Sequence, residues 1–500
     1  MSANLSDRPF ADRDAVDPGR RNQEAMSLSW QLGRFVSTLG WQELPDAVRA
    51  AFRRTMIDYL SCVAAGSGMP QARAAREYAA AAGGQPVATV IGSGMKAAMQ
   101  DAAFANGTAA HALDFDDGHR EGSAHPGGVI ISAALAVAES IGSDWSAFSE
   151  AVVAGYEVML RISAAIHPAS ALRGWHNSSV AGVFGSAAAS GRLLGLDANA
   201  LGHAMGLAGS FSGGIREYLY DGSDVKRLHL GKAARDGILC AELAGRGLTG
   251  PRRVLEGANG LFRALTGGEA DPERVLRGIG SDWEMAAVYF KPYPCCRHFQ
   301  AAIDAVLELR DQAALEAIAD IEIGLYGPAV PGHTHTRAST LLDAQMSAPC
   351  AIVTALVHGS PGVRHFEPDI FASDQVRGLL SKTRVVTNPL CDVEYPAVRG
   401  AIVKLTLNDG SALERRVRNP KGEAENPLSD DELRRKLAAN CTPGFSGDEV
   451  EKLSANIFAD AYQGRPVTDF TADIAAGFKQ SQWANLSAIP STTVRGELAD

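Results

Sequence analysis

The chain has 500 residues, of which 46% are hydrophobic and 21% charged, so it is long enough for two or three domains around a large core. Its formal net charge of −10 argues against non-specific binding to nucleic acid, whose phosphates attract a basic surface. No run of apolar residues predicts a membrane span, and the seven cysteines are too sparse for a disulfide framework, so we expect a cytoplasmic protein with free thiols.

The N-terminal residues 1–28 predict a disordered segment. They mix both charge signs and contain no apolar core, which argues against a secretory signal. Four aspartates among the first 17 residues argue against a mitochondrial transit peptide.

Residues 29–274 predict a helical domain. Apolar stretches of helical length recur, as at 128–142, 147–166 and 182–196, and they carry alanine and glycine at many positions. Such small residues are typical of closely packed, mostly buried helices. The clearest strand signal in this region is the β-branched stretch 86–93.

Residues 275–430 predict an α+β lid domain. The segments 318–327, 383–388 and 401–417 are β-branched or alternate in polarity, and Asp409-Gly410 predicts a tight hairpin within the last. Helical segments such as 298–312 and 344–359 are interleaved with these strands.

Residues 431–500 predict C-terminal helices that complete the helical domain, with Ser429 at a helix start. The expected fold class is therefore mainly α with an α+β second domain: a large all-helical domain plus a smaller α+β lid.

The segment 111–128, "HALDFDDGHREGSAHPGG", concentrates aspartates and histidines in a turn between two helical stretches. Neighbouring carboxylates and imidazoles can tune one another for acid–base catalysis. The alternative is structural, since Asp116 or Asp117 could cap the following helix. The spacings match no compact zinc motif, so we predict no metal site.

Two further segments carry candidate residues. His176 precedes a helix that begins near Ser178, where free amides could bind an anion, although a lone histidine at a helix start is usually structural. Lys226 and His229 alternate with Val225 and Leu228, and a cation among residues that favour burial is costly unless an anion meets it.

The stretch 291–305, "KPYPCCRHFQAAIDA", contains two adjacent cysteines beside Lys291 and Arg297. No other segment supplies matching metal ligands, so we interpret Cys295 and Cys296 as packing residues. The chain has no GxGxxG, Walker A or GxSxG motif, so we predict no organic cofactor.

The segments "HALDFDD…HPGG", "GWHNSSVAGVFG", "DGSDVKRLHLGKAARDG" and "KPYPCCRHFQAAIDA" together resemble the MmgE/PrpD family over roughly residues 29–470. This family includes 2-methylcitrate dehydratases, cis-aconitate decarboxylases and iminodisuccinate epimerases. The resemblance implies a two-domain homodimer that acts on small di- or tricarboxylates between its domains without a metal or organic cofactor. It implies catalytic roles for Asp114, His125, His176, Lys226 and Lys291. The predicted substrate-binding residues are Lys226, His229, Lys291, Arg297 and Cys350.

Two positions depart from the family pattern. Gly118 stands where decarboxylase members carry threonine, and Cys350 stands where many members carry tyrosine. Both departures argue against cis-aconitate decarboxylation itself.

The mechanism expected from these residues is electrostatic. Lys226 and Lys291 would hold substrate carboxylates and stabilise a carbanion or aci-carboxylate intermediate, while His125 or His176 transfers the proton and Asp114 orients one of them. A lyase of the dehydratase or decarboxylase type is the first hypothesis. An epimerase or isomerase of an imino- or aminodicarboxylate is the second, and a non-catalytic carboxylate-binding homologue is the third.

Overall fold

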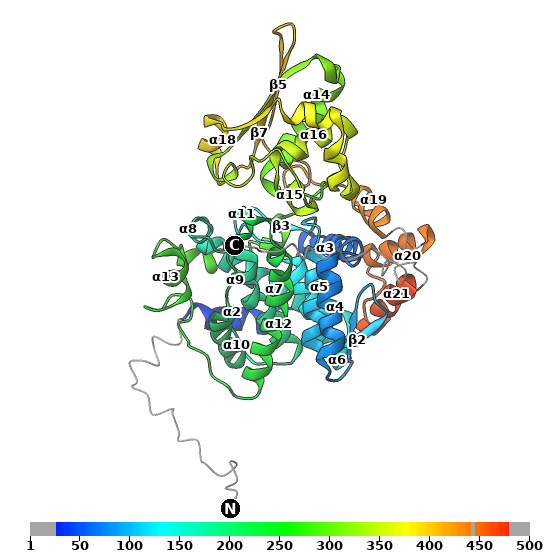
Figure 1. Cartoon of the computed structure of the whole chain (residues 1–500). Helices are drawn as coiled ribbons and strands as arrows, with labels where there is room; N and C mark the ends of the chain where they lie inside the picture. The colour runs from blue at the N-terminus through cyan, green and yellow to red at the C-terminus, as the bar shows by residue number, and fades with distance from the viewer. Residues whose placement is uncertain (1–26, 442–445, 480–500) are drawn as a thin grey trace, which may run out of the picture.

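The computed structural model describes residues 27–441 and 446–479, so nearly all of the predicted disordered segment 1–28 lies outside the described residues. Figure 1 shows a large helical body with a smaller body of mixed helices and strands above it. Each body has its own cluster of buried hydrophobic residues. The predicted fold class is confirmed.

The helical body is built from closely approaching helices. Where α7 and α9 cross, a Cβ atom added to Gly185 would lie 2.6 Å from the carbonyl oxygen of Gly155, so only glycine allows this approach. The long helices are α2 (Leu28–Thr38), α3 (Asp46–Gly66), α4 (Pro70–Ala82), α5 (Met99–His111), α6 (Gly127–Ile141), α7 (Trp145–Ile166), α9 (Asn177–Leu193), α10 (Ala198–Phe211) and α12 (Val225–Gly245). Shorter helices are α8 (Ala169–Leu172), α11 (Tyr218–Asp221) and α13 (Leu261–Thr266).

Two short antiparallel ribbons accompany these helices. The predicted strand at 86–93 contains β1 (Ala88–Val90), which pairs with β2 (Met95–Ala97). The second ribbon joins β3 (Gly118–His119) to β4 (Val288–Tyr289), with Gly118 opposite Tyr289. It therefore ties the aspartate-rich turn to the segment that leads into the upper body.

The upper body contains a four-stranded sheet of order β6-β5-β7-β8, in which β5 and β6 are parallel and the other pairs antiparallel. Its strands are β5 (Ile318–Leu325), β6 (Thr383–Thr387), β7 (Ala401–Leu407) and β8 (Ala412–Val417). The predicted hairpin joins β7 to β8, and Gly410 adopts a φ of 86° there. The helices are α14 (Gln300–Leu309), α15 (Leu341–Met346), α16 (Ala348–His358), α17 (Asp374–Leu380) and α18 (Pro389–Glu394).

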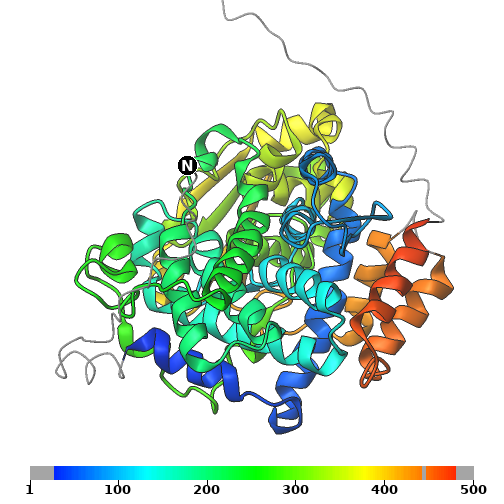
Figure 2. The same ribbon diagram turned by 90° about the horizontal axis from the view of Figure 1, so that it is seen from below.

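The chain then returns to the helical body through α19 (Asp430–Cys441), α20 (Gly447–Phe458) and α21 (Val467–Lys479). The Ser429 hydroxyl accepts a hydrogen bond from the backbone N–H of Glu432, as expected for a helix start. Figures 1 and 2 both place these orange and red helices on one flank of the body, where α19 packs against α3. The predicted domain boundaries at 29–274, 275–430 and 431–500 stay predictions.

In the part of the chain that the structure describes, no helix combines the length and apolar character needed to cross a membrane.

Candidate active site

A cavity of about 600 Å³, including its mouth, is lined by residues of both bodies. The helical body contributes Asp114, Ser123, His125, Ala171, Trp175, His176, Asn177, Arg216, Tyr218, Leu219 and Lys226. The later segments contribute Tyr289, Cys296, Arg297, His298, His333, Met346 and Arg399. Four of the five predicted catalytic residues therefore line one cavity, and the fifth, Lys291, contacts Asp114 directly.

Asp114 holds two lysines together. It lies just after α5 with a φ of 52°, a left-handed conformation that aspartate tolerates better than most residues. The Lys226 Nζ atom lies 2.9 Å and the Lys291 Nζ atom 3.1 Å from Asp114 Oδ1. Lys291 also donates a hydrogen bond of 2.7 Å to the Asp114 carbonyl oxygen. Asp114 Oδ2 is buried and has no hydrogen-bond partner among the described residues.

These contacts fix the charge state of the group. Burial opposes ionisation of Asp114, but the ammonium groups of Lys226 and Lys291 outweigh it and hold the pKa of this carboxyl well below its usual range. Burial lowers the pKa of Lys226, and Asp114 only partly offsets this effect. For Lys291, Asp114 and the nearby Tyr289 and Asp116 outweigh burial and raise the pKa. Lys226 is therefore the more acidic of the two ammonium groups.

His125 presents a bare nitrogen to this cluster. Its Nδ1 atom lies 2.7 Å from the carbonyl oxygen of Asp117, which can only accept a hydrogen bond, so the neutral ring carries its proton on Nδ1. The Nε2 atom then has a free lone pair 3.9 Å from Asp114 Oδ1. Burial lowers the pKa of His125 to about 3, although Asp116 acts in the opposite direction. The imidazole is therefore neutral at pH 7 and can accept a proton.

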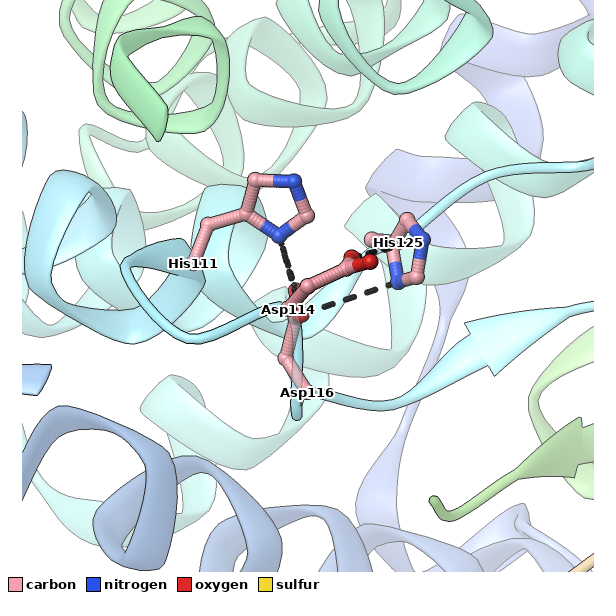
Figure 3. A group of neighbouring side chains, drawn as sticks. All are labelled: His111, Asp114, Asp116 and His125. Carbon is pink, nitrogen blue, oxygen red and sulfur yellow. Dashed lines mark hydrogen bonds and ion pairs between the residues drawn. The ribbon is translucent and has the colours of Figure 1, made fainter. Parts of the chain in front are cut away.

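The neighbouring side chains brace this arrangement. Figure 3 shows Asp114 and Asp116 between the rings of His111 and His125. Asp116 Oδ1 lies 2.9 Å from His111 Nδ1. Asp117 Oδ1 accepts a hydrogen bond of 2.9 Å from the backbone N–H of Gly127 at the start of α6, which confirms the structural alternative for this residue.

His176 forms a second imidazole group on the cavity wall. It precedes α9, and its Nδ1 atom lies 2.8 Å from Nδ1 of His229, which stands one turn after Lys226 on α12. Burial lowers the pKa of His176 well below its usual range and the pKa of His229 to about 4. One ring must donate and the other accept, so a proton change on His176 is coupled to His229. His229 itself does not line the cavity.

The ligand atoms of His111, Asp114, Asp116 and His125 lie within 4.8 Å of one another, a spacing at which such a group could hold a metal ion. The surroundings do not fit a dication, because two ammonium groups already lie against Asp114. We therefore derive no step through a metal.

The structure places the cysteines of the sequence analysis in different surroundings. Cys295 and Cys296 both belong to the upper cluster of buried residues, as expected for packing residues, and Cys296 also lines the cavity. Its Sγ atom lies 3.6 Å from His333 Nε2, and His333 Nδ1 donates to the Pro331 carbonyl oxygen, so the thiol donates to the imidazole. Cys350, predicted to bind substrate, is fully buried in α16 inside the upper cluster and does not line the cavity.

Gly118 has a steric explanation. A Cβ atom at this position would lie 2.3 Å from the Tyr289 hydroxyl oxygen and 2.4 Å from its Cζ atom. Tyr289 lines the cavity, so its phenol fills the space that a side chain on residue 118 would occupy. A hydroxyl group is therefore present at this wall although residue 118 carries none.

The sequence pointed to Arg297 and to the stretch that holds Cys296 and His298, but not to several other cavity residues of the upper body and the α10–α12 region. Arg216, Tyr218, Tyr289, His333 and Arg399 line the cavity, and each stands in a segment without a motif of its own. Only the tertiary fold brings them to one place.

Comparisons with known proteins agree with this architecture. The sequence model of the MmgE/PrpD N-terminal domain matches residues 30–273, and that of the MmgE/PrpD C-terminal domain matches residues 293–458. The second match runs through α19 into α20, which pack on the helical body.

Similar proteins include the cis-aconitate decarboxylase-like protein oryM of Aspergillus oryzae, 28% identical over 87% of this chain and 94% of that protein. The cis-aconitate decarboxylase of Aspergillus terreus is 26% identical over 85% of this chain and 91% of its own length. The human cis-aconitate decarboxylase is 30% identical over 70% of this chain and 74% of its own length. These similarities support a lyase-type enzyme, and the chain belongs to the MmgE/PrpD family.

Proposed function

We propose that this protein is a lyase that removes carbon dioxide from a small unsaturated tricarboxylate such as cis-aconitate, without a metal or organic cofactor. The observation that carries the proposal is the group at the cavity wall, in which Asp114 holds Lys226 and Lys291 together beside the bare Nε2 of His125. The similarity to cis-aconitate decarboxylases supplies the choice of substrate.

In the proposed reaction the bond between a methylene carbon and its carboxylate breaks, and the carboxylate leaves as carbon dioxide. The released electron pair forms a new double bond to the methylene carbon. The old double bond shifts its pair to the far alkene carbon and onto the attached carboxylate, which gives an aci-carboxylate intermediate. A proton then adds to that carbon, so a trianion and one proton give a dianion and carbon dioxide.

The charged residues match these steps. The ammonium groups of Lys226 and Lys291 stabilise the negative charge that develops on the aci-carboxylate. A substrate that brings three negative charges into the cavity raises the pKa of His125, so the complex takes up a proton at Nε2. That proton is then available for the substrate carbon.

An isomerase that exchanges a proton at a stereocentre is the second candidate. It is favoured by the coupled pair His176 and His229, because such exchange needs a second group that can carry a proton. Gly118 and Cys350 depart from the decarboxylase pattern, which also favours an isomerase over a decarboxylase.

One experiment separates these functions. The purified protein is mixed with citrate, 2-methylcitrate, cis-aconitate and aminodicarboxylates in deuterated water, and products are followed by NMR. Carbon dioxide release supports the decarboxylase, and loss of water indicates a dehydratase. Deuterium exchange without net loss indicates the isomerase, and thermal stabilisation without turnover indicates a non-catalytic binder.

The site assignment is tested on the substrate so identified. Lys226→Ala and His125→Ala should each lower turnover at least ~10²-fold. Arg384→Ala is the matched control, because Arg384 is exposed, pairs with Asp320 and Glu322, and does not line the cavity. Near-normal turnover in both site variants would contradict the assignment.

Prolonged treatment with a chelator tests the metal-independent mechanism. Turnover should be unchanged, and elemental analysis should find no stoichiometric metal. A homodimer and a cytoplasmic location stay predictions, of which light scattering tests the first.

A further inference from the structure

Three arginines line the cavity in addition to the lysine cluster. Arg216 stands between α10 and α11, Arg297 begins the short 3-10 helix η4 (Arg297–Phe299), and Arg399 stands just before β7. They come from three segments that are far apart in the chain. Only Arg297 stands in a segment with a recognisable motif.

The hydrogen-bond donors of these side chains are incompletely used. Arg297 is 5% exposed and pairs through Nη2 with Glu423, but its Nε and Nη1 atoms have no partner within residues 27–441 and 446–479. Arg399 is 3% exposed and donates through Nη2 to the Arg120 carbonyl oxygen at 2.6 Å, whereas its Nε atom has no partner in that range.

Arg216 is half-buried and donates through Nη1 to the Ala171 carbonyl oxygen at 3.3 Å. In the described part of the chain, no carboxylate forms an ion pair with Arg216 or Arg399. Of the three guanidinium groups, only that of Arg297 therefore has a carboxylate partner among the described residues, and this partner, Glu423, also pairs with Arg120.

This excess of positive charge affects its neighbours. His298 and His333 line the same part of the cavity. Burial, followed by Arg216, lowers the pKa of His333 to about 4. Burial also lowers the pKa of His298 well below its usual range, and His333, Arg399 and Arg216 lower it further. Both rings are therefore neutral at pH 7 and leave the charge of the arginines uncompensated.

A buried guanidinium without a counter-charge is costly, and each unused N–H donor adds to that cost. A carboxylate removes both penalties at once, because its two oxygens match the planar fork of a guanidinium. The lysine cluster differs, since Asp114 already supplies its anion.

We propose that Arg216, Arg297 and Arg399 form a second anion subsite, which holds a substrate carboxylate that does not react and so selects ligands by their number of carboxylates. The choice of polycarboxylates as ligands rests on the proposed function. Arg216 also lines a neighbouring groove with Leu172, Ile215 and Tyr395, so it is the one of the three arginines that borders both hollows.

Calorimetric titration with unreactive probes tests the subsite. Tricarballylate, glutarate and butyrate carry three, two and one carboxylates, and none has a double bond or hydroxyl group that the proposed chemistry could use. Wild type should bind tricarballylate most tightly. Arg399→Gln and Arg216→Gln should each weaken tricarballylate binding about 10- to 100-fold and butyrate binding much less.

The controls keep this outcome interpretable. Arg384→Gln, outside the cavity lining, should bind all three probes as wild type does. Arg399→Lys retains the charge and should recover part of the affinity that Arg399→Gln loses. Arg216 is half-buried, so its variant stays folded even where loss of Arg399 lowers the thermal midpoint.

Unchanged tricarballylate affinity in Arg216→Gln and in a folded Arg399 variant would overturn the subsite, and so would an equal loss for all three probes. The measurement needs no turnover. If the protein binds tricarballylate through these arginines but converts no polycarboxylate, the subsite is supported and the proposed function is contradicted. If it converts a polycarboxylate but binds tricarballylate without these arginines, the proposed function is supported and the subsite is contradicted.

Discussion

The two groups of cations at the cavity are built differently. Lys226 and Lys291 share the carboxylate of Asp114, so each has a fixed partner and a fixed position. Arg216 and Arg399 have no carboxylate partner in the described residues and bond only to backbone carbonyl groups or neutral side chains. A paired cation is preorganised and can act on charge that develops during a reaction, whereas an unpaired one favours an anion that arrives already charged.

The variant with the largest expected effect on this difference removes the carboxylate of Asp114, which the two lysines share. Asp114→Asn leaves two buried ammonium groups without a counter-charge, which should cost about 3–5 kcal/mol of folding stability. Turnover should fall ~10²- to 10³-fold, because both lysines lose their position. Urea unfolding and steady-state kinetics measure the two effects.

Asp116→Asn is the matched control. This aspartate is equally buried and close in sequence, but its nearest partner is His111, whose pKa is lowered by burial and by Lys226, so that the ring is neutral. The control should be the more stable variant by a clear margin. Equal stability of the two variants would mean that the lysines do not depend on Asp114.

The sequence singled out the paired group but only one member of the unpaired group. Asp114, His125 and the two lysines lie in segments that concentrate charged residues and histidines, and the family resemblance selects these four residues within them. Arg216 and Arg399 stand alone in ordinary loops, and an arginine in a loop is normally solvated. Their burial depends on how the upper body lies against the lower one, which no local pattern encodes.

The fold shows the same difference between features that local sequence predicts and features that depend on contacts between distant segments. The hairpin at Asp409-Gly410 and the helix start at Ser429 follow from local backbone preferences, and both were predicted. The burial of Lys436 was not. Its Nζ atom lies 2.7 Å from Asp58 Oδ1 and donates to the carbonyl oxygens of Phe115 and Lys291, contacts that span 378, 321 and 145 residues of the chain.

A second test uses pH, because both groups lie among histidines that are neutral in the folded protein. His125 and His333 have pKa values of about 3 and about 4, against about 6.5 in an unfolded chain. Between these values the unfolded chain binds more protons, so stability is complete above pH 6.5 and is lost as the pH falls below it.

At pH 5 each of these histidines should cost roughly 2 kcal/mol relative to pH 7. The comparison of urea unfolding at the two pH values should show a smaller difference in His333→Gln than in wild type. An identical difference would show that His333 is not kept neutral by the fold.

A third test concerns Tyr289 and Gly118, at the part of the cavity that lies close to both the lysine group and the arginine group. Burial raises the pKa of Tyr289 to about 12 against the opposing charges of Lys291, Arg297 and Arg399, so this phenol lies close to both groups. Gly118→Ala places a Cβ atom against the ring and should cost about 1–3 kcal/mol through overpacking.

The double variant Gly118→Ala with Tyr289→Ala separates this clash from other effects. Removal of the ring relieves the overlap, so the two substitutions together should cost less than the sum of the single costs. Thermal unfolding measures all four proteins. Strictly additive costs would show that Gly118 and Tyr289 do not constrain each other.

The smallest expected effects distinguish the two thiols. Cys350 packs inside the upper cluster, away from the cavity, so Cys350→Ala should cost about 1 kcal/mol of stability and leave the KM within about twofold of wild type. Cys296→Ala should change the KM more, because this thiol lines the cavity and donates to His333 among the arginines. The opposite order would place Cys350 in contact with substrate, as the family pattern suggested, and would require the upper body to move when substrate binds.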